Sequence, residues 1–356
     1  MFDYGGAPST DEVEVTLFGP GFGEAIAVHI GNGEWLLIDS CTLPDTGEPA
    51  SLHYLQALEV PLDRVKGVVA SHWHQDHVAG LSTITAQCPQ AQLWISDAFT
   101  NAEGLAFLEG YNEEDSGGTS RGTKELYQAI LSVDNNRRRR AHQQTIIYER
   151  RDDVAVRVSV FAPTHGAVNQ TLARLSSYIP AEGHDRNDAP PELAPNLEAI
   201  VLHIQVADLS ILLGSDLENH PTNGWANIVN DPWIQGFPRA SLYKVAHHGS
   251  TTAEHPGIWT GLLQPQPLSV VTPFRHGRVK LPTDPDALRI KGVSSALHQT
   301  SYQPPRTRLP KDIEDKMVTI ATTFVPQNAG FGAVRARRRL HEAEWRVEHF
   351  GHAAKR

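Results

Sequence analysis

The stretch Ser71–His77 (SHWHQDH) decides the fold of this 356-residue chain. It directly follows the apolar run RVKGVVA, which predicts a buried strand. Three imidazoles and one carboxylate within six residues are ligand types that zinc and its first-row neighbours prefer. The spacing allows His72 and His74 to face one metal ion while Asp76 and His77 turn towards a second. A polar loop with scattered histidines is the alternative, and the position of these ligand types directly after a buried strand argues against it.

The first hundred residues alternate between short apolar strands and helices. Strands are predicted at Glu12–Phe18, Glu24–Ile30, Trp35–Ile38, Arg64–Ala70 and Ala91–Ser96, and helices at Ala50–Leu58 and Gly80–Cys88. An Asn-Gly pair at Asn32 and Gly33, between two apolar runs, is a strong hairpin signal. Strands that alternate with helices favour an α/β architecture.

The rest of the chain is a mixture of regular and irregular stretches. Asn101–Arg151 carries acidic and glycine-rich segments around a predicted helix (Thr123–Val133), and Asn169–Pro195 predicts a surface loop. Further strands are predicted at Val154–Val160, Leu197–Val206, Leu209–Leu213, Tyr243–Ala246 and Leu268–Thr272, and a closing hairpin at Met317–Val325 and Ala333–Arg339. We expect a core domain over residues 1–290, with an insertion at about 101–151, and a C-terminal extension over 291–356 that packs on or beside it.

The composition excludes several classes of protein. Hydrophobic residues make up 40% of the chain and charged residues 20%, which supports a full core and excludes a wholly disordered chain. No stretch approaches the roughly 20 apolar residues that span a bilayer, and the first residues lack the features of a secretory signal. Cys41 and Cys88 alone cannot form a disulfide framework and fit a reducing compartment. We therefore expect a cytoplasmic protein with no membrane partner. The net charge of −10 excludes a basic coat over the whole surface, but not a local basic groove.

The histidine motif and three further motifs resemble one known family. His-x-His-x-Asp-His after a strand is similar to the signature of the metallo-β-lactamase-fold hydrolases. Gly21–Ala25 with Trp35–Asp39 resembles the opening hairpin of that family, Ile211–Asp216 (ILLGSD) the strand that ends in a bridging aspartate, and Tyr243–Ser250 (YKVAHHGS) the last ligand motif. The Gly-x-Gly-acidic start at Gly21–Glu24, the LLGSD strand and the HHGS run are most similar to the branch that contains the nuclease-like domain of the competence protein ComEC. The resemblance covers roughly Val13 to Pro285.

The resemblance implies an αββα sandwich with a dinuclear metal site at one edge. Asp216 would bridge two divalent ions about 3.5–4 Å apart, and a shared water would lose a proton to become the nucleophile. The ions would be Zn²⁺, with Mn²⁺ as the alternative. His247 would close the second site, so that His248 points towards the substrate or is only structural. Asp39 would hold the histidine loop by hydrogen bonds, or be an ordinary turn residue at a strand end.

One ligand of the first metal ion is left open between two residues. His165 follows the predicted strand Val154–Val160 and has the place in the chain where the family supplies a third histidine. The ComEC-like branch instead has an asparagine that opens the strand before the bridging aspartate, and Asn196 fits that pattern. Without His165, the first site keeps two histidines and Asp216.

These features together predict a metal-dependent hydrolase that uses a metal-bridging hydroxide. The leading substrate is an anionic phosphodiester in DNA, RNA or a nucleotide, with Asp76 and His248 in catalytic roles. The first alternative is a hydrolase of a small carboxylic ester, lactone, thioester or amide. The second is a non-catalytic metal-binding module that works with a protein partner. Arg137–Arg140 and Lys244 are candidates for contacts with phosphate. The alternative for the arginines is a solvated charge run, and the alternative for Lys244 is a charge at a strand edge.

Overall fold

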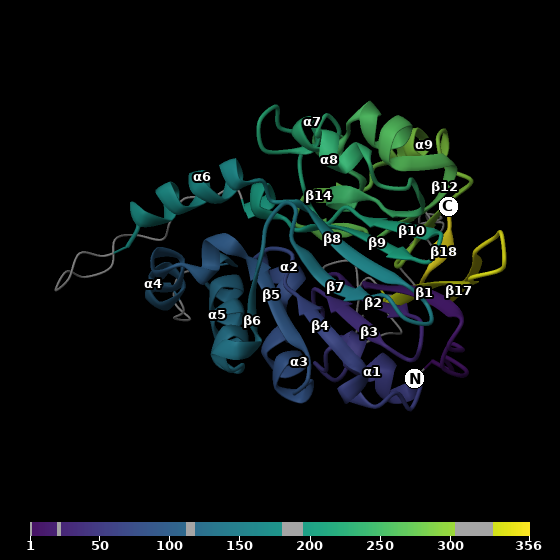
Figure 1. The fold of residues 1–356 in the computed structure, drawn as a ribbon, viewed down its shortest axis with the longest axis horizontal. Helices are drawn as coiled ribbons and strands as arrows, with labels where there is room; N and C mark the ends of the chain where they lie inside the picture. Colours follow the sequence, from purple (N-terminus) through teal and green to yellow (C-terminus); the bar gives the residue numbers. More distant parts are fainter. Residues whose placement is uncertain (1, 20–22, 112–117, 180–194, 303–329) are drawn as a thin grey trace, which may run out of the picture.

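Two eight-stranded sheets pack face to face at the centre of the computed structural model (Figure 1), which describes residues 2–19, 23–111, 118–179, 195–302 and 330–356. The first sheet has the order β17 (Arg346–Gly351), β16 (Gly332–Arg339), β1 (Glu12–Gly19), β2 (Ala25–Ile30), β3 (Trp35–Ile38), β4 (Val65–Val69), β5 (Gln92–Ser96) and β6 (Arg138–Ala141). The second has the order β18 (Ala354–Lys355), β15 (Ala296–Gln299), β12 (Leu263–Val271), β11 (Ala240–Lys244), β10 (Leu209–Leu213), β9 (Val201–Val206), β8 (Val156–Ala162) and β7 (Ile146–Arg150). A small hairpin, β13 (Phe274–His276) and β14 (Val279–Leu281), stands apart from both.

Successive side chains along the strands enter different cores. In β3, Leu36 and Ile38 belong to the core between the two sheets, whereas Trp35 and Leu37 belong to the core on the outer face. This alternation is the two-residue period of a strand whose faces are both covered. The sequence therefore dictates a layer on each side of the first sheet.

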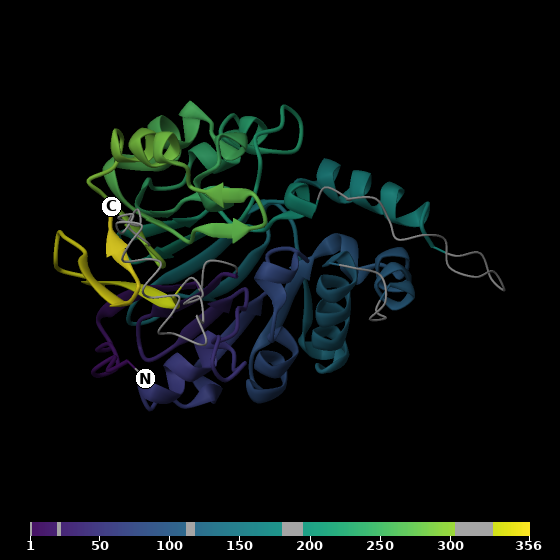
Figure 2. The same cartoon turned by 180° about the vertical axis from the view of Figure 1, so that it is seen from behind.

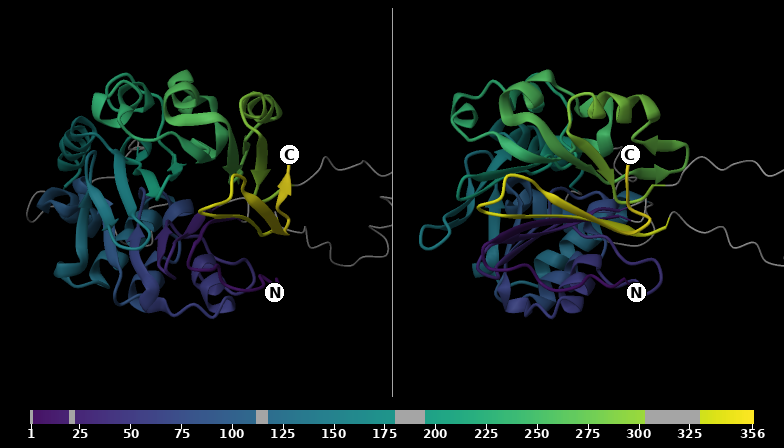
Figure 3. Two further views of the ribbon diagram at one scale, coloured as in Figure 1. Left: turned by 45° about the vertical axis from the view of Figure 1, so that its right-hand side comes forward. Right: turned by 90° about the vertical axis from the view of Figure 1, so that its right-hand side faces the viewer.

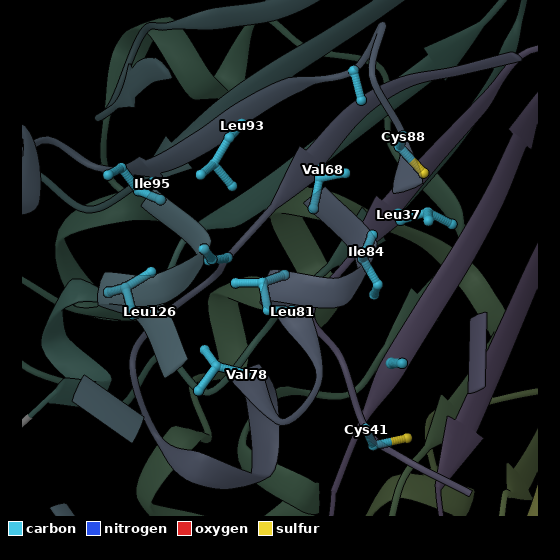
Figure 4. Packing of buried hydrophobic residues seen from close by; sticks show 14 of the residues in the cluster. Leu37, Cys41, Val68, Val78, Leu81, Ile84, Cys88, Leu93, Ile95 and Leu126 are labelled. Atoms are coloured by element: carbon cyan, nitrogen blue, oxygen red, sulfur yellow. The ribbon is translucent and has the colours of Figure 1, made fainter. Parts of the chain in front are cut away.

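Helices supply the outer layers. The outer face of the first sheet packs against α1 (Ala50–Ala57), α3 (Leu81–Gln87), α4 (Ala102–Gly110) and α5 (Gly118–Leu131). Figure 4 shows that core, in which Leu37, Val68 and Leu93 from the strands meet Leu81, Ile84 and Leu126 from the helices. The second sheet is covered by α7 (Trp225–Ile228), α8 (Pro232–Gln235) and α9 (Asp284–Lys291). Figure 2 shows the same layers from behind, and the expected αββα sandwich is confirmed.

Residues 101–151 and 169–195, expected to be an insertion and a surface loop, contain strands and helices that belong to the sandwich or adjoin it. Within the stretch expected to be an insertion, β6 pairs in parallel with β5 of the first sheet and β7 pairs with β8 of the second. The prediction of a loop from residue 169 onwards is wrong at its start, because α6 (His165–Ser176) is helical. The expected strand Met317–Val325 lies outside the described residues.

The C-terminal residues supply strands to both sheets. β16 pairs with β1 and β17 in the first sheet, while β15 and β18 pair in the second (Figure 3). Arg337 Nε donates to Glu14 Oε2 at 2.6 Å, and Arg335 donates to the carbonyl of Tyr4 at 2.6 Å. The buried arginines of β16 therefore hold this strand against the N-terminal segment.

Parallel pairing brings the ends of the central strands to one edge of the sandwich. β3 pairs in parallel with β4 in one sheet, and β10 with β11 in the other. The residues after these strands, Asp39, Ser71, Asp216 and His248, therefore meet at the carboxyl ends, where open α/β sheets place their sites. Within the described residues, no helix combines the length and the apolar character needed to cross a membrane.

His203 of β9 is a buried histidine away from that edge. Its ring lies between Phe161 and Phe237, with centroid separations of 5.2 and 5.1 Å. Nε2 donates to the carbonyl of Pro238 at 2.8 Å, whereas Nδ1 has no hydrogen-bond partner. A proton on Nδ1 would leave a buried charge unpaired, and burial accordingly lowers the pKa of His203 to about 4.

We expect His203→Gln to reduce the loss of stability on acidification. In the wild type, the unfolded chain binds a proton near pH 6.5, while the folded chain binds it only near pH 4. Folded-state stability therefore falls as the pH drops through this window, by about 2 kcal/mol at pH 5 for this one group. Urea unfolding at pH 7 and pH 5 measures the difference, and equal losses in both proteins would contradict this assignment.

Candidate metal centre

A buried carboxylate fixes the loop that carries the histidines. Asp39, at the end of β3, accepts hydrogen bonds from the backbone N–H of Ser71 at 2.7 Å and from its hydroxyl at 2.6 Å. His77 Nδ1 donates to the same carboxylate at 2.8 Å. Because the Ser71 hydroxyl donates its hydrogen bond to Asp39, its oxygen accepts a hydrogen bond from His72 Nδ1 at 3.0 Å. Asp39 therefore holds the loop, as expected, and leaves Nε2 of His77 free to bind a metal ion, while Nε2 of His72 faces His74.

The side chains of this loop and of Asp216 form one cluster. His72 Nε2 lies 3.0 Å from His74 Nδ1, and the rings of His72 and His77 are 4.2 Å apart. His77 Nε2 lies 3.7 Å from Asp76 Oδ2 and 3.4 Å from Asp216 Oδ2. His77 and Asp76 lie in the short helix α2 (Gln75–Val78), whereas Asp216 comes from the other sheet, after β10. The cluster thus joins the two halves of the sandwich.

A turn after β11 brings His248 into this cluster. His248 Nε2 lies 3.2 Å from Asp216 Oδ2 and 3.5 Å from Asp76 Oδ2. Its Nδ1 donates to the carbonyl of Thr272 at 2.9 Å, so Nε2 is the free nitrogen. His247, His248 and Gly249 all have positive φ values, of 46°, 52° and 82°. Two consecutive non-glycine residues in this region are a local strain of the kind found at functional sites.

His247 lies outside the cluster. Its Nδ1 is 2.9 Å from Thr252 Oγ1 and 3.2 Å from Glu218 Oε1, and its Nε2 is 3.4 Å from Asn196 Nδ2. The structure thus places the imidazole of His248 in the cluster, whereas the sequence predicted His247 as the ligand and His248 towards the substrate. The left-handed backbone of the turn causes this, because it rotates the second imidazole inwards instead of the first.

The two candidates for the open ligand position lie in other surroundings. His165 is exposed at the start of α6, and its ring is 4.4 Å from that of His142. Asn196 Nδ2 faces His247 and Glu218. Among the described residues, the groups with metal-binding geometry are His72–His77–Asp216, Asp76–His77–His248 and Glu24–Asp39–His77, and neither candidate belongs to them.

The donor atoms of the cluster fit divalent metal ions. Within each group they lie within 4.8 Å of one another, close to the limit of about 4.6 Å set by two opposite ligand bonds of ~2.3 Å. Nε2 of His77, Nε2 of His248 and Oδ1 of Asp216 are buried and have no hydrogen-bond partner. Buried polar atoms without partners are rare, and a cation between them would satisfy all three.

The charges of the cluster favour a cation as well. Burial lowers the pKa of His77 and His248, but the neighbouring carboxylates, Asp216 above all, outweigh it. They hold the pKa of His77 well above its usual value and raise that of His248 to about 10. Burial and the adjacent imidazoles of His77 and His74 instead hold the pKa of His72 well below its usual value. The carboxylates therefore attract positive charge, while His72 offers a neutral nitrogen.

A buried ion pair supports Asp216 from behind. Lys244 Nζ lies 2.6 Å from Glu24 Oε1 and 3.6 Å from Asp216 Oδ1, and it donates to the carbonyl of Ser215 at 3.0 Å. Both Lys244 and Glu24 are fully buried, so Lys244 is neither a substrate contact nor an edge charge. Sequence reasoning missed this pair, although a charged residue within each of two apolar strand stretches was a usable signal.

We expect His248→Ala to weaken metal binding by at least about 10²-fold, because even an outer partner of a ligand is worth 10–100-fold. His247→Ala is the matched control, since it removes the neighbouring imidazole while leaving the cluster intact. Zinc competition with a chromophoric chelator and metal analysis of the purified proteins give the two affinities. Normal metal binding by His248→Ala, with loss in His247→Ala, would restore the order expected from the sequence.

Comparisons with known proteins found one family model and similar solved structures. Residues 18–169 match the family model described as the Metallo-beta-lactamase superfamily, and this range includes the whole histidine loop. A putative metallo-beta-lactamase from Thermotoga maritima is similar at 13% identity and TM-score 0.32, over 57% of this chain and 79% of that one. Rm3 metallo-beta-lactamase is similar at 13% identity and TM-score 0.34, over 72% of this chain and 83% of that one. No curated protein sequence matches the chain. The part of the chain that matches the Metallo-beta-lactamase superfamily model therefore also carries His72, Asp76 and His77 of the buried cluster.

Proposed function

We propose that this protein hydrolyses phosphodiesters with the help of two divalent metal ions. The superfamily and the His/Asp cluster support a metal-dependent hydrolase. One observation carries the finer proposal: a partly exposed His247, which contacts the Thr252 hydroxyl, the Asn196 amide and the Glu218 carboxylate, lies directly beside the buried cluster. Such donors suit the non-bridging oxygens of a phosphate, whereas a small ester or lactone needs fewer of them.

The residues of the cluster would divide between two ions. His72, His74 and Asp216 would hold one, and Asp76, His77 and His248 the other. Zn²⁺ suits these imidazole and carboxylate ligands, and Mn²⁺ is the alternative. When bound, such ions supply Lewis acidity, which activates water and stabilises the negative charge that develops on a substrate oxygen.

Asp76 is the carboxylate that a water molecule can reach. Its side chain is 9% exposed, compared with 3% for Asp216. Burial raises the pKa of Asp76, but His77 and His248 outweigh this and hold the pKa below its usual value. Asp76 is therefore ionised at neutral pH and can accept a hydrogen bond from the attacking water and orient it.

His247 is the substrate-facing member of the pair in this proposal. Its side chain is 19% exposed, and its ring lies 6.1 Å from that of His248. Thr252 Oγ1 contacts both His247 Nδ1, at 2.9 Å, and Ser250 Oγ, at 3.1 Å. This row of donors would bind a phosphate oxygen or assist the leaving oxygen, the role that the sequence suggested for His248.

We expect Asp76→Asn to lower hydrolysis of bis(p-nitrophenyl) phosphate by about 10²–10⁴-fold, the usual range for a group that handles the reacting proton. Asp208→Asn makes the same chemical change in the exposed turn between β9 and β10 and should leave turnover unchanged. Metal-loaded proteins are assayed side by side on the phosphodiester, a lactone and p-nitrophenyl acetate.

Three outcomes of this assay would contradict the proposal. Turnover of only the lactone or the acetate by the wild type would favour a carboxylic ester hydrolase. No turnover of any substrate at full metal content would favour a metal-binding partner module. Wild-type turnover by metal-loaded Asp76→Asn would exclude the role given to this carboxylate.

A further inference from the structure

The hairpin Phe274–Leu281, formed by β13 and β14, is attached at both ends to the turn that carries His248. Two residues before the hairpin, the carbonyl of Thr272 accepts the hydrogen bond from His248 Nδ1, and the ring of Phe274 lies 5.2 Å from that of His248. On the other side, Gly249 packs so closely against Pro282 that an added Cβ would lie 3.1 Å from the proline Cβ. The light-green hairpin lies on the face turned towards the viewer in Figure 2. It therefore stands directly beside the metal centre.

The hairpin carries unpaired positive charge. Its sequence, FRHGRVKL, contains Arg275, Arg278 and Lys280 and no acidic residue, in a chain whose net charge is −10. Arg278 and Lys280 are exposed and Arg275 is half-buried. In the part of the chain that the structure describes, none of the three has an ion pair or a side-chain hydrogen bond. The buried Arg337, by contrast, pairs with Glu14.

The register of the hairpin adds an unfavourable interaction. Arg275 lies directly opposite Lys280 across the two strands. Like charges in directly opposed positions destabilise a strand pair, by a few tenths of a kcal/mol up to about 1 kcal/mol. The folded hairpin does not benefit from this arrangement. An anion that binds to both side chains would offset the repulsion.

We propose that the hairpin Phe274–Leu281 is a docking arm for the phosphate backbone of a nucleic acid, next to the bond to be cleaved. This inference rests on the proposed function and names its substrate as a polymer. Three cations on one arm match successive backbone phosphates, and they carry no base-reading geometry. The contact of Phe274 with His248 fixes the distance between the arm and the catalytic cluster.

The test compares two triple variants. Arg275→Gln/Arg278→Gln/Lys280→Gln removes the charges of the arm. Arg64→Gln/Arg151→Gln/Arg239→Gln removes three exposed charges that lie before β4, after β7 and before β11, at the opposite edge of the sheets. Binding of fluorescent 20-nucleotide DNA, RNA and duplex DNA is measured by polarisation in metal-loaded protein that also carries Asp76→Asn, so that no probe is cleaved. Turnover of bis(p-nitrophenyl) phosphate is measured without Asp76→Asn.

We expect the arm variant to bind the best of the three probes at least tenfold more weakly at 50 mM salt. The slope of log Kd against log salt should fall by about 2, because each lost phosphate contact removes about 0.7–0.9 from it. The control variant should keep both values. Turnover of the small phosphodiester should stay within about twofold in both variants, since that substrate does not reach the arm. The thermal midpoint of the arm variant should be unchanged or higher, because a repulsion is removed.

Other results would overturn the inference. The first is that the arm variant and the control variant bind the probes equally well, and the second is that the parent protein binds no probe. The third is that the arm variant loses turnover of the small phosphodiester by the same factor as it loses nucleic-acid binding. Arm-dependent binding without cleavage of any phosphodiester by the metal-loaded wild type would instead overturn the proposed function and leave the arm as a nucleic-acid binding site.

Discussion

The hydrogen bonds of Asp39 are the interaction on which the site depends. Burial of a carboxylate is unfavourable unless its oxygens are paired, and Asp39 is paired by the backbone and hydroxyl of Ser71 and by His77 Nδ1. Those three donors belong to the loop that follows β4, so the cost of burying Asp39 is offset only when the loop adopts one conformation. That conformation directs Nε2 of His72 and of His77 to the same point. Lys244 and Glu24 perform the corresponding task for Asp216 in the second sheet.

The metal centre forms only where the two sheets pack together, because Asp39 positions the residues from the first sheet and Lys244 positions Asp216 in the second. The first sheet supplies the histidine loop, and the second supplies Asp216 and His248, so the groups His72–His77–Asp216 and Asp76–His77–His248 each need residues from both sheets. Metal binding is therefore coupled to the face-to-face packing of the strands. The charges follow the same division: Lys244 compensates Glu24, while Asp76 and Asp216 keep an excess of negative charge that only the imidazoles and a bound cation balance.

The sequence predicted correctly those elements whose apolar alternation or ligand spacing is visible in the residues themselves. The strand Trp35–Ile38 and the SHWHQDH loop follow from alternation and ligand spacing, and both occur as expected. It failed at β6, because the sequence RRRA has no apolar alternation and is a strand only through its pairing with β5. It placed His247 instead of His248 in the cluster, because the inward direction of the His248 imidazole depends on left-handed backbone angles that the residue types at these positions do not predict.

We infer that the metal ions bind between the two sheets, at the free nitrogens of His77 and His248 and the carboxylates of Asp76 and Asp216. Anomalous diffraction from crystals grown with Zn²⁺, collected on both sides of the zinc absorption edge, tests this most directly. We expect anomalous peaks about 2.0–2.3 Å from Nε2 of His77 and His248. Peaks at His247 or His165, with His248 Nε2 farther than a ligand bond from any ion, would contradict it.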